Sequence, residues 1–172
     1  VDLFTRDAGR VAVAAKGAKR PTSNLRAVLM PFQRIQVSFG RAARDDAASD
    51  IRNLRGAEWG GGAPLAGGEA LLAGFYLNEL VMKLLARDDP HPVLWDAYAA
   101  TLPHLGSAEE SAALRAFELI LLAETGHLPE IARTTATQQP LEPARRYLLR
   151  PEAGLMDASG DDETAIAGAH FL

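Results

Sequence analysis

The segment from Gly68 to Arg87 constrains the fold more than any other part of this sequence. It carries apolar residues on almost every face of a helix. A helix that is apolar all round is buried inside a protein, so we expect this segment to form one long helix at the centre of a helical domain. Pro90-His91-Pro92 breaks it, because proline lacks a backbone N–H and cannot continue a helix.

Alternating residues before this helix predict short β-strands. Val1–Thr5 and Arg10–Lys16 flank a turn at Asp7-Ala8-Gly9 and predict a hairpin. Gln33–Phe39 and Asp50–Arg55 predict two further strands. Four short strands at this spacing are typical of a small barrel or sandwich.

The sequence Gly60-Gly61-Gly62-Ala63-Pro64 divides the chain into two predicted domains. The β domain covers residues 1–60, and the helical domain covers residues 61–172. Within the β domain, Ser23–Met30 fits either a strand or a helical turn.

Two shorter helices are predicted after the long one. One covers about 92–103, and the other begins at a capping box between Ser107 and Glu110 and ends at a glycine. An irregular segment and a small hairpin near 145–157 are expected next. A last helix is predicted to begin at Asp161, because acidic residues favour the positive end of a helix dipole.

The residues of common catalytic and metal sites are absent or isolated. The chain has no cysteine, which excludes disulfides, thiolate zinc sites and cysteine nucleophiles, and which suggests a reducing cytoplasm. The glycine motifs that bind dinucleotides and nucleoside triphosphates do not occur. Asp88, Asp89 and His91 are candidate metal ligands, but the flanking prolines and the helix end favour a structural role. We therefore expect no enzyme activity, no cofactor and no metal.

Polar residues on the long helix are expected to have structural partners. Glu79 and Lys83 lie four residues apart and predict a surface ion pair. Tyr76 and Asn78 are expected to hydrogen-bond to the β domain or to the following loop, because polar groups on a buried helix need partners. No stretch reaches about 18 consecutive apolar residues, so we expect no transmembrane helix.

Basic residues concentrate in the first third of the chain. Residues 1–60 contain 11 Lys and Arg against 6 Asp and Glu, whereas residues 61–172 contain 7 against 16. Such a balance is typical of a surface that binds a polyanion, although an ordinary solvated surface gives the same counts. Arg41 and Arg44 belong to this basic set. The residues that we expect to bind nucleic-acid phosphates are Arg10, Lys16, Lys19, Arg20, Arg26, Arg34, Arg52 and Arg55.

Three aromatic residues of the β domain are candidate stacking faces for unpaired bases. They are Phe32, Phe39 and Trp59. Phe39 is in phase with Ile35 and Val37, which favours a place for it in the core.

Short motifs spread over nearly the whole chain resemble, in order and spacing, the bacterial RecO family of recombination mediators. The motifs are Phe4-Thr5-Arg6-Asp7-Ala8-Gly9-Arg10, Ala15-Lys16-Gly17-Ala18-Lys19-Arg20-Pro21, Leu29-Met30-Pro31-Phe32, Ala57-Glu58-Trp59, Gly74-Phe75-Tyr76-Leu77-Asn78-Glu79-Leu80, Asp89-Pro90-His91-Pro92 and Phe117-Glu118-Leu119. The resemblance implies an α+β protein with an N-terminal OB-fold barrel and an α-helical C-terminal domain. An OB-fold has five strands, and the sequence predicts four, so we expect the first strand to be missing before Val1. Some family members carry a four-cysteine zinc module in the region of 126–158, and we expect none here.

The same resemblance implies a function in recombinational DNA repair. It implies binding to single- and double-stranded DNA, annealing of complementary strands, and loading of RecA onto DNA covered by single-strand-binding protein. The implied partners are RecR, the C-terminal tail of the single-strand-binding protein and, indirectly, RecA, with no membrane. The implied location is the bacterial cytoplasm, at the nucleoid. The alternative is a helical protein–protein adaptor with a structural β domain and no DNA contact.

Overall fold

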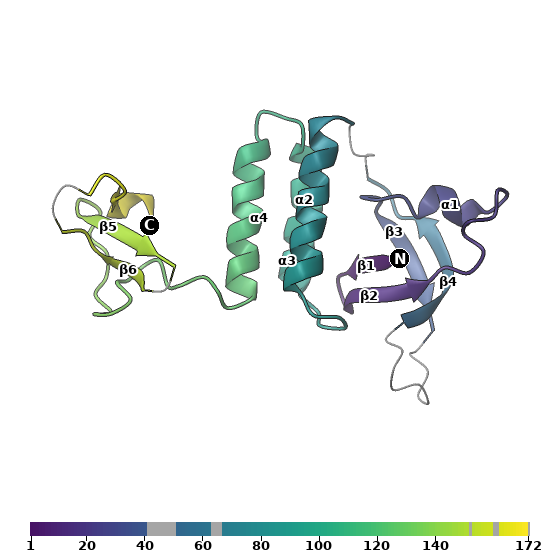
Figure 1. The fold of residues 1–172 in the computed structure, drawn as a ribbon, viewed down its shortest axis with the longest axis horizontal. Helices are drawn as coiled ribbons and strands as arrows, with labels where there is room; N and C mark the ends of the chain where they lie inside the picture. The colour runs from purple at the N-terminus through teal and green to yellow at the C-terminus, as the bar shows by residue number, and fades with distance from the viewer. Residues whose placement is uncertain (41–50, 63–66, 152, 160–161, 172) are drawn as a thin grey trace. The chain divides into compact units, whose positions relative to one another are not determined.

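The structure is a computed structural model that describes residues 1–40, 51–62, 67–151, 153–159 and 162–171. The chain divides into two compact units, Val1–Glu124 and Thr125–Leu172. The first unit contains a sheet and a group of helices, and the second contains three short strands (Figure 1).

The first unit begins with a four-stranded sheet. Its strands are β1 (Asp2–Thr5), β2 (Gly9–Ala14), β3 (Ile35–Phe39) and β4 (Ile51–Trp59). The strand order is β1-β2-β4-β3, and every pair is antiparallel except β2 and β4, which run parallel. The short helix α1 (Asn24–Val28) connects β2 to β3 and settles the ambiguous segment as helical. Four strands are described where an OB-fold has five, and β1 and β3 are the edges of the sheet that the structure describes.

Burial along the strands follows the predicted patterns. The central strand β2 buries Val11, Ala12 and Val13 in succession, as a strand covered on both faces does. In β3, half-buried Ile35 and Val37 alternate with exposed polar residues. A bulge shifts the β3–β4 register between Ser38 and Phe39.

Three helices follow the sheet and pack around one core. They are α2 (Glu69–Leu84), α3 (Pro92–Thr101) with the 3₁₀ turn η1 (Leu102–His104), and α4 (Glu110–Glu124) (Figure 1). Leu77, Leu94 and Phe117 are fully buried at the centre of this core, one from each helix. Phe4 of β1 packs against the same core, so the sheet and the helices share it.

The prediction that the long helix is buried on every face is wrong. Only Ala70, Gly74, Leu77 and Val81 of α2 are buried, and they form one stripe. Leu72 on another face is 70% exposed. Two further helices and the edge of one small sheet cannot surround α2, so most of its apolar residues remain at the surface.

The start of α4 also differs from the predicted capping box. Ser107 Oγ accepts the Glu109 N–H at 3.1 Å, and the Glu110 carboxylate accepts the Gly106 N–H at 2.6 Å. Both side chains satisfy backbone donors near the helix start, but not in the reciprocal pairing of a capping box. The predicted Glu79–Lys83 ion pair is confirmed, with 2.6 Å between the charged atoms.

The second unit is a small antiparallel sheet with its own core. Its elements are β5 (Arg146–Arg150), β6 (Gly154–Asp157), β7 (Ile166–Ala167) and the 3₁₀ turn η2 (Gly168–His170). The strand order β6-β5-β7 contains the predicted hairpin, which is confirmed. Its core consists of Leu141, Tyr147 and Leu155.

The predicted last helix is wrong for the residues that are described. Asp162 accepts hydrogen bonds from the N–H and the hydroxyl of Thr164, at 2.9 and 2.6 Å. These bonds lower the pKa of Asp162 and hold a local turn, an alternative that aspartate offers to a helix. The chain then enters β7.

Two classes of feature are missing from the part of the chain that the structure describes. No helix there is long and apolar enough to cross a membrane. In the same residues, no group of three or more His, Asp or Glu side chains is arranged to hold a metal ion.

Candidate nucleic-acid interface

Arg10 is placed inside the joint between the sheet and the helices. Its side chain is 12% exposed and lies 3.6 Å from the Asp2 carboxylate. Its guanidinium donates to the carbonyl oxygens of Met82 and Leu85 at the C-terminal end of α2. A cation there satisfies carbonyls that the helix leaves unpaired and complements the negative end of the helix dipole. Arg10 is therefore engaged within the molecule.

Arg52 belongs to the same joint. Its guanidinium lies 2.6 Å from the Asp88 carboxylate and 5.2 Å from the centre of the Phe39 ring. The backbone N–H of Asp88 donates to the carbonyl oxygen of Arg10, so both arginines hold the segment after α2 against the sheet.

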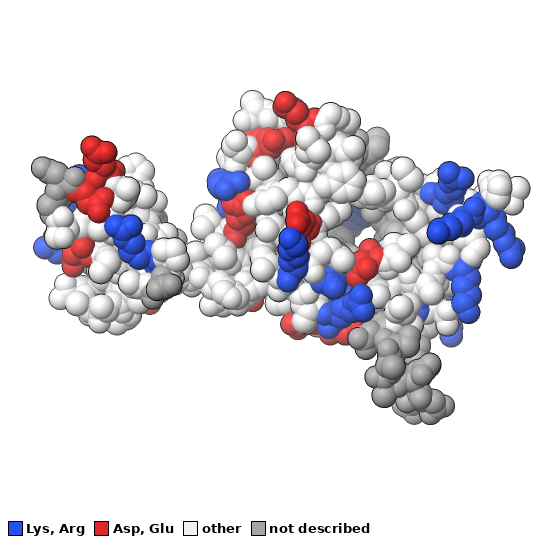
Figure 2. Space-filling view, viewed as in Figure 1, with Lys and Arg blue, Asp and Glu red and all other residues white. Residues whose placement is uncertain are grey.

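The other six predicted phosphate-binding residues are exposed. They are Lys16, Lys19, Arg20, Arg26, Arg34 and Arg55. Among the described residues, no carboxylate lies within ion-pair distance of any of them. Figure 2 shows Lys and Arg side chains gathered around α1, at the right of the view. Arg41 and Arg44 lie outside the described residues. We call the six residues the basic surface.

One sequence signal covers five of the six residues of this surface, all except Arg55. Residues 8–44 contain eight Lys and Arg and no Asp or Glu. Counting charges over residues 1–60 hides this run, because all six acidic residues of that segment lie outside it. Among the described residues of this run, only Arg10 has an ion-pair partner, the Asp2 carboxylate outside the run.

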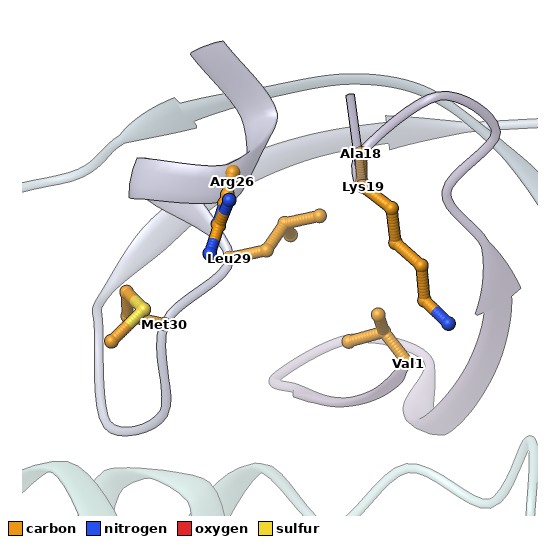
Figure 3. Close-up of a pocket in the computed structure, with 6 residues that line it drawn as sticks. All are labelled: Val1, Ala18, Lys19, Arg26, Leu29 and Met30. Carbon is orange, nitrogen blue, oxygen red and sulfur yellow. The ribbon is translucent and has the colours of Figure 1, made fainter. Parts of the chain in front are cut away.

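Two members of the basic surface border a pocket of about 410 Å³ beside α1 (Figure 3). Lys19 comes from the loop after β2, and Arg26 comes from α1. Leu29 lies between the two side chains in the picture, and Met30 lines the pocket below Arg26. Cationic groups at the rim of an apolar floor suit a ligand that has both anionic and apolar parts, as a nucleotide has.

The three candidate stacking residues differ in how accessible their rings are. Phe32 is half-buried, with its ring centre 5.2 Å from that of Phe75. Phe39 is half-buried beneath the Arg52 guanidinium. Trp59 is 61% exposed. Among the described residues of the β domain, Trp59 alone presents an open aromatic face.

The polar residues of α2 are held by the other helices, not by the β domain or the following loop as predicted. Tyr76 donates to the Glu118 carboxylate of α4 at 2.6 Å, and this bond raises the pKa of Tyr76. Tyr98 of α3 donates to the Asn78 side-chain carbonyl at 2.6 Å, and burial raises the pKa of Tyr98. The structural role expected for them is confirmed.

The candidate metal ligands after α2 also have partners within the chain. Asp88 is paired with Arg52. The two ring nitrogens of His91 lie 3.4 Å from Asp89 and 3.6 Å from Glu124. These groups hold the turn between α2 and α3 close to the end of α4.

The fold and the surface together define a class of protein: an OB-type β domain with a basic face, joined through buried contacts to a helical body. Family models described as the N-terminal and the C-terminal part of recombination protein O match residues 1–56 and 66–164. The chain is 52% identical to the DNA repair protein RecO of Polaromonas naphthalenivorans, over 99% of this chain and 68% of the relative. It is 50% identical to the DNA repair protein RecO of Variovorax paradoxus, over 99% of this chain and 66% of the relative.

The chain therefore belongs to the RecO family of DNA repair and recombination proteins, which confirms the resemblance. It spans about two thirds of the length of these relatives. The family models separate near residue 60, whereas the compact units of the structure separate after Glu124. The predicted domain limits of 1–60 and 61–172 stay a prediction.

Proposed function

We propose that this chain binds single- and double-stranded DNA through the basic surface of its β domain and acts as a recombination mediator. In that role it anneals complementary strands and helps to load RecA onto DNA covered by single-strand-binding protein. It does so without enzymatic chemistry or a cofactor, at the nucleoid in the cytoplasm. The observation that carries the proposal is a set of six exposed Lys and Arg side chains with no carboxylate partner among the described residues.

The chemistry of the basic surface suits the DNA backbone. Lys and Arg neutralise phosphates and release the ions condensed around DNA, which favours binding whatever the base sequence. Two strands held on one cationic surface repel each other less, so complementary strands meet more readily. Arg10 and Arg52 contribute indirectly in this proposal, because they fix the β domain on the helices.

The protein partners are part of the same proposal. We assign RecR and the C-terminal tail of the single-strand-binding protein as direct partners, and RecA as an indirect one, on the strength of the family alone. The adaptor alternative is favoured by one observation, the exposed apolar residues Leu72 of α2 and Leu119 of α4. A DNA-binding measurement separates the two functions, since an adaptor needs no DNA contact.

The decisive experiment measures fluorescence polarisation of labelled single- and double-stranded oligonucleotides at several salt concentrations. We expect affinity to fall steeply as salt rises. Replacing Lys19 and Arg20 together with alanine should weaken binding and make the log–log salt slope shallower by about 1.4 on single strands, at about 0.7 per phosphate contact. Lys83→Ala is the matched control, because Lys83 is an exposed lysine paired with Glu79 on α2.

The result that contradicts DNA binding is wild-type polarisation that stays flat at low salt, and this result would favour the adaptor. Annealing is tested by the pairing rate of two complementary labelled strands, which the Lys19 and Arg20 double variant should slow. RecA loading is tested by the ATPase activity of RecA on DNA covered by single-strand-binding protein, with RecR present.

A further inference from the structure

The two tryptophans of the chain have different environments. Trp95 is half-buried, its indole N–H donates to the Phe4 carbonyl at 3.0 Å, and the Arg34 guanidinium lies 5.6 Å from its ring centre. Trp59, the last residue of β4, is 61% exposed, and within the described part of the chain its side chain has no hydrogen bond, ring contact or cation over its ring. Proteins that bind single-stranded nucleic acid combine aromatic side chains of this kind with a cationic surface, and successive bases stack on them.

The backbone beyond Trp59 keeps this ring accessible. The next three residues are glycines, and Gly61 and Gly62 have φ values of 92° and 96°. A Cβ built on Gly61 would meet no atom within 4 Å. No side chain follows the indole along the chain for three residues, so a flat molecule can approach it closely.

The end of β4 also lies beside members of the basic surface. The Gly60 N–H donates to the Arg34 carbonyl at 2.8 Å, which places the Arg34 backbone next to the end of the strand. Helix α1, which carries Arg26, packs beside β4. The nearest carboxylate in the sequence, Glu58, belongs to the opposite face of the sheet, because adjacent strand residues alternate. Trp59 therefore combines an open ring with a place at the strand end that borders the Arg34 backbone, in a strand packed beside the helix that carries Arg26.

We propose that Trp59 stacks on an unpaired base of single-stranded DNA while the basic surface holds the neighbouring phosphates. This inference rests on the proposed function and adds a ligand preference to it. Stacking needs the face of a base, which a duplex hides between neighbouring pairs, so Trp59 favours single strands. Every base has such a face, so the contact is tolerant of sequence.

The test compares the affinity of four proteins for a poly-dT oligonucleotide and for a blunt duplex. We expect Trp59→Ala to weaken single-strand binding roughly 5- to 150-fold, the range that loss of one stacked base produces. Duplex binding should change less than twofold. Trp59→Phe should restore most of the affinity, because phenylalanine still stacks. Leu72→Ala is the control for loss of an exposed apolar side chain away from the basic surface, and it should bind as the wild type does.

Tryptophan fluorescence supplies an independent measurement of the same contact. Poly-dT should quench the wild-type emission, and this quenching should disappear in Trp59→Phe even though that variant binds DNA. Equal single-strand affinities for wild type and Trp59→Ala, with wild-type binding intact, would overturn this inference and leave the proposed function standing. Wild-type protein that binds neither DNA at low salt would overturn both.

Discussion

The guanidinium of Arg10 lies 2.9 Å from the carbonyl oxygen of Leu85, although 75 positions separate the two residues in the chain. Arg10 belongs to the central strand of the sheet, and Leu85 follows the last residue of α2. An arginine expected from sequence to meet DNA thus caps a helix, and its replacement should act on stability.

We expect Arg10→Ala to lower the free energy of unfolding by about 1.5–3 kcal/mol, because it removes charge-assisted hydrogen bonds and leaves carbonyls of α2 unpaired. Urea denaturation followed by circular dichroism measures the change. Lys16→Ala, at an exposed lysine without an ion-pair partner among the described residues, should stay within about 0.5 kcal/mol of the wild type. Equal stabilities for the two variants would contradict the capping role.

Arg52 and Arg55 provide a second comparison between two arginines of one strand. Arg52 is half-buried against Asp88, whereas Arg55 is exposed. We expect Arg52→Ala to cost about 1 kcal/mol of stability and Arg55→Ala to cost less. DNA affinity should show the opposite order, with a larger loss for Arg55→Ala than for Arg52→Ala. The affinities are measured at low salt under conditions in which both variants are folded. A larger loss of affinity for Arg52→Ala would show that Arg52 contacts DNA after all.

The contact between β2 and the segment after α2 requires a glycine at position 9. Its φ is 66°, and a Cβ at this position would lie 2.0 Å from the Asp89 carbonyl oxygen. We expect Gly9→Ala to destabilise the protein by about 2 kcal/mol or more, from backbone strain and from separation of the 87–89 segment from β2. Gly61→Ala is the control, because Gly61 also has a positive φ but has open space around its Cβ. Thermal unfolding should show a clearly smaller shift for the control.

The Arg6–Asp96 pair should make stability depend on pH in the acid range. Two hydrogen bonds of 3.0 Å join the guanidinium to the carboxylate, and the bond to Arg6 holds the pKa of Asp96 below its ordinary value of 3.8. A carboxyl whose pKa is lower in the folded state stabilises the protein above its unfolded-state pKa, and this contribution is lost as pH falls through the folded-state pKa. The difference in stability between wild type and Asp96→Asn should therefore be present at pH 6 and shrink as pH falls below the ordinary value of 3.8 and through the lowered folded-state pKa of Asp96. A difference that stays the same size as the protein is titrated from pH 6 into the acid range would contradict this assignment.

The sequence predicted the local elements well where their signal is periodic. The alternation of Ile35, Val37 and Phe39 in β3 corresponds to the observed faces of the strand. Burial of α2 was misjudged because the composition of a helix does not tell how many neighbours cover it. The helix expected at Asp161 was outweighed by the side-chain turn of Asp162.

The sequence predicted most of the residues that form the candidate site, but it did not predict where each side chain lies. Charge patterning finds arginines, but it does not distinguish one that faces solvent from one that caps a helix far along the chain. Arg10 and Lys16 look alike in sequence, and their environments differ only because β2 lies beside the end of α2. The exposure of Trp59 depends likewise on the glycines after it and on the end of its strand.

The contacts of Gly9, Arg10 and Arg52 make the sheet and the three helices one cooperative folding unit. Each contact joins a strand to the segment after α2, so neither part can melt without breaking bonds that hold the other. Calorimetry should accordingly record a single transition for residues 1–124, although the family models separate near residue 60. A protease that cuts at the glycines after Trp59 should produce two fragments. These fragments should remain bound to each other until a denaturant is added.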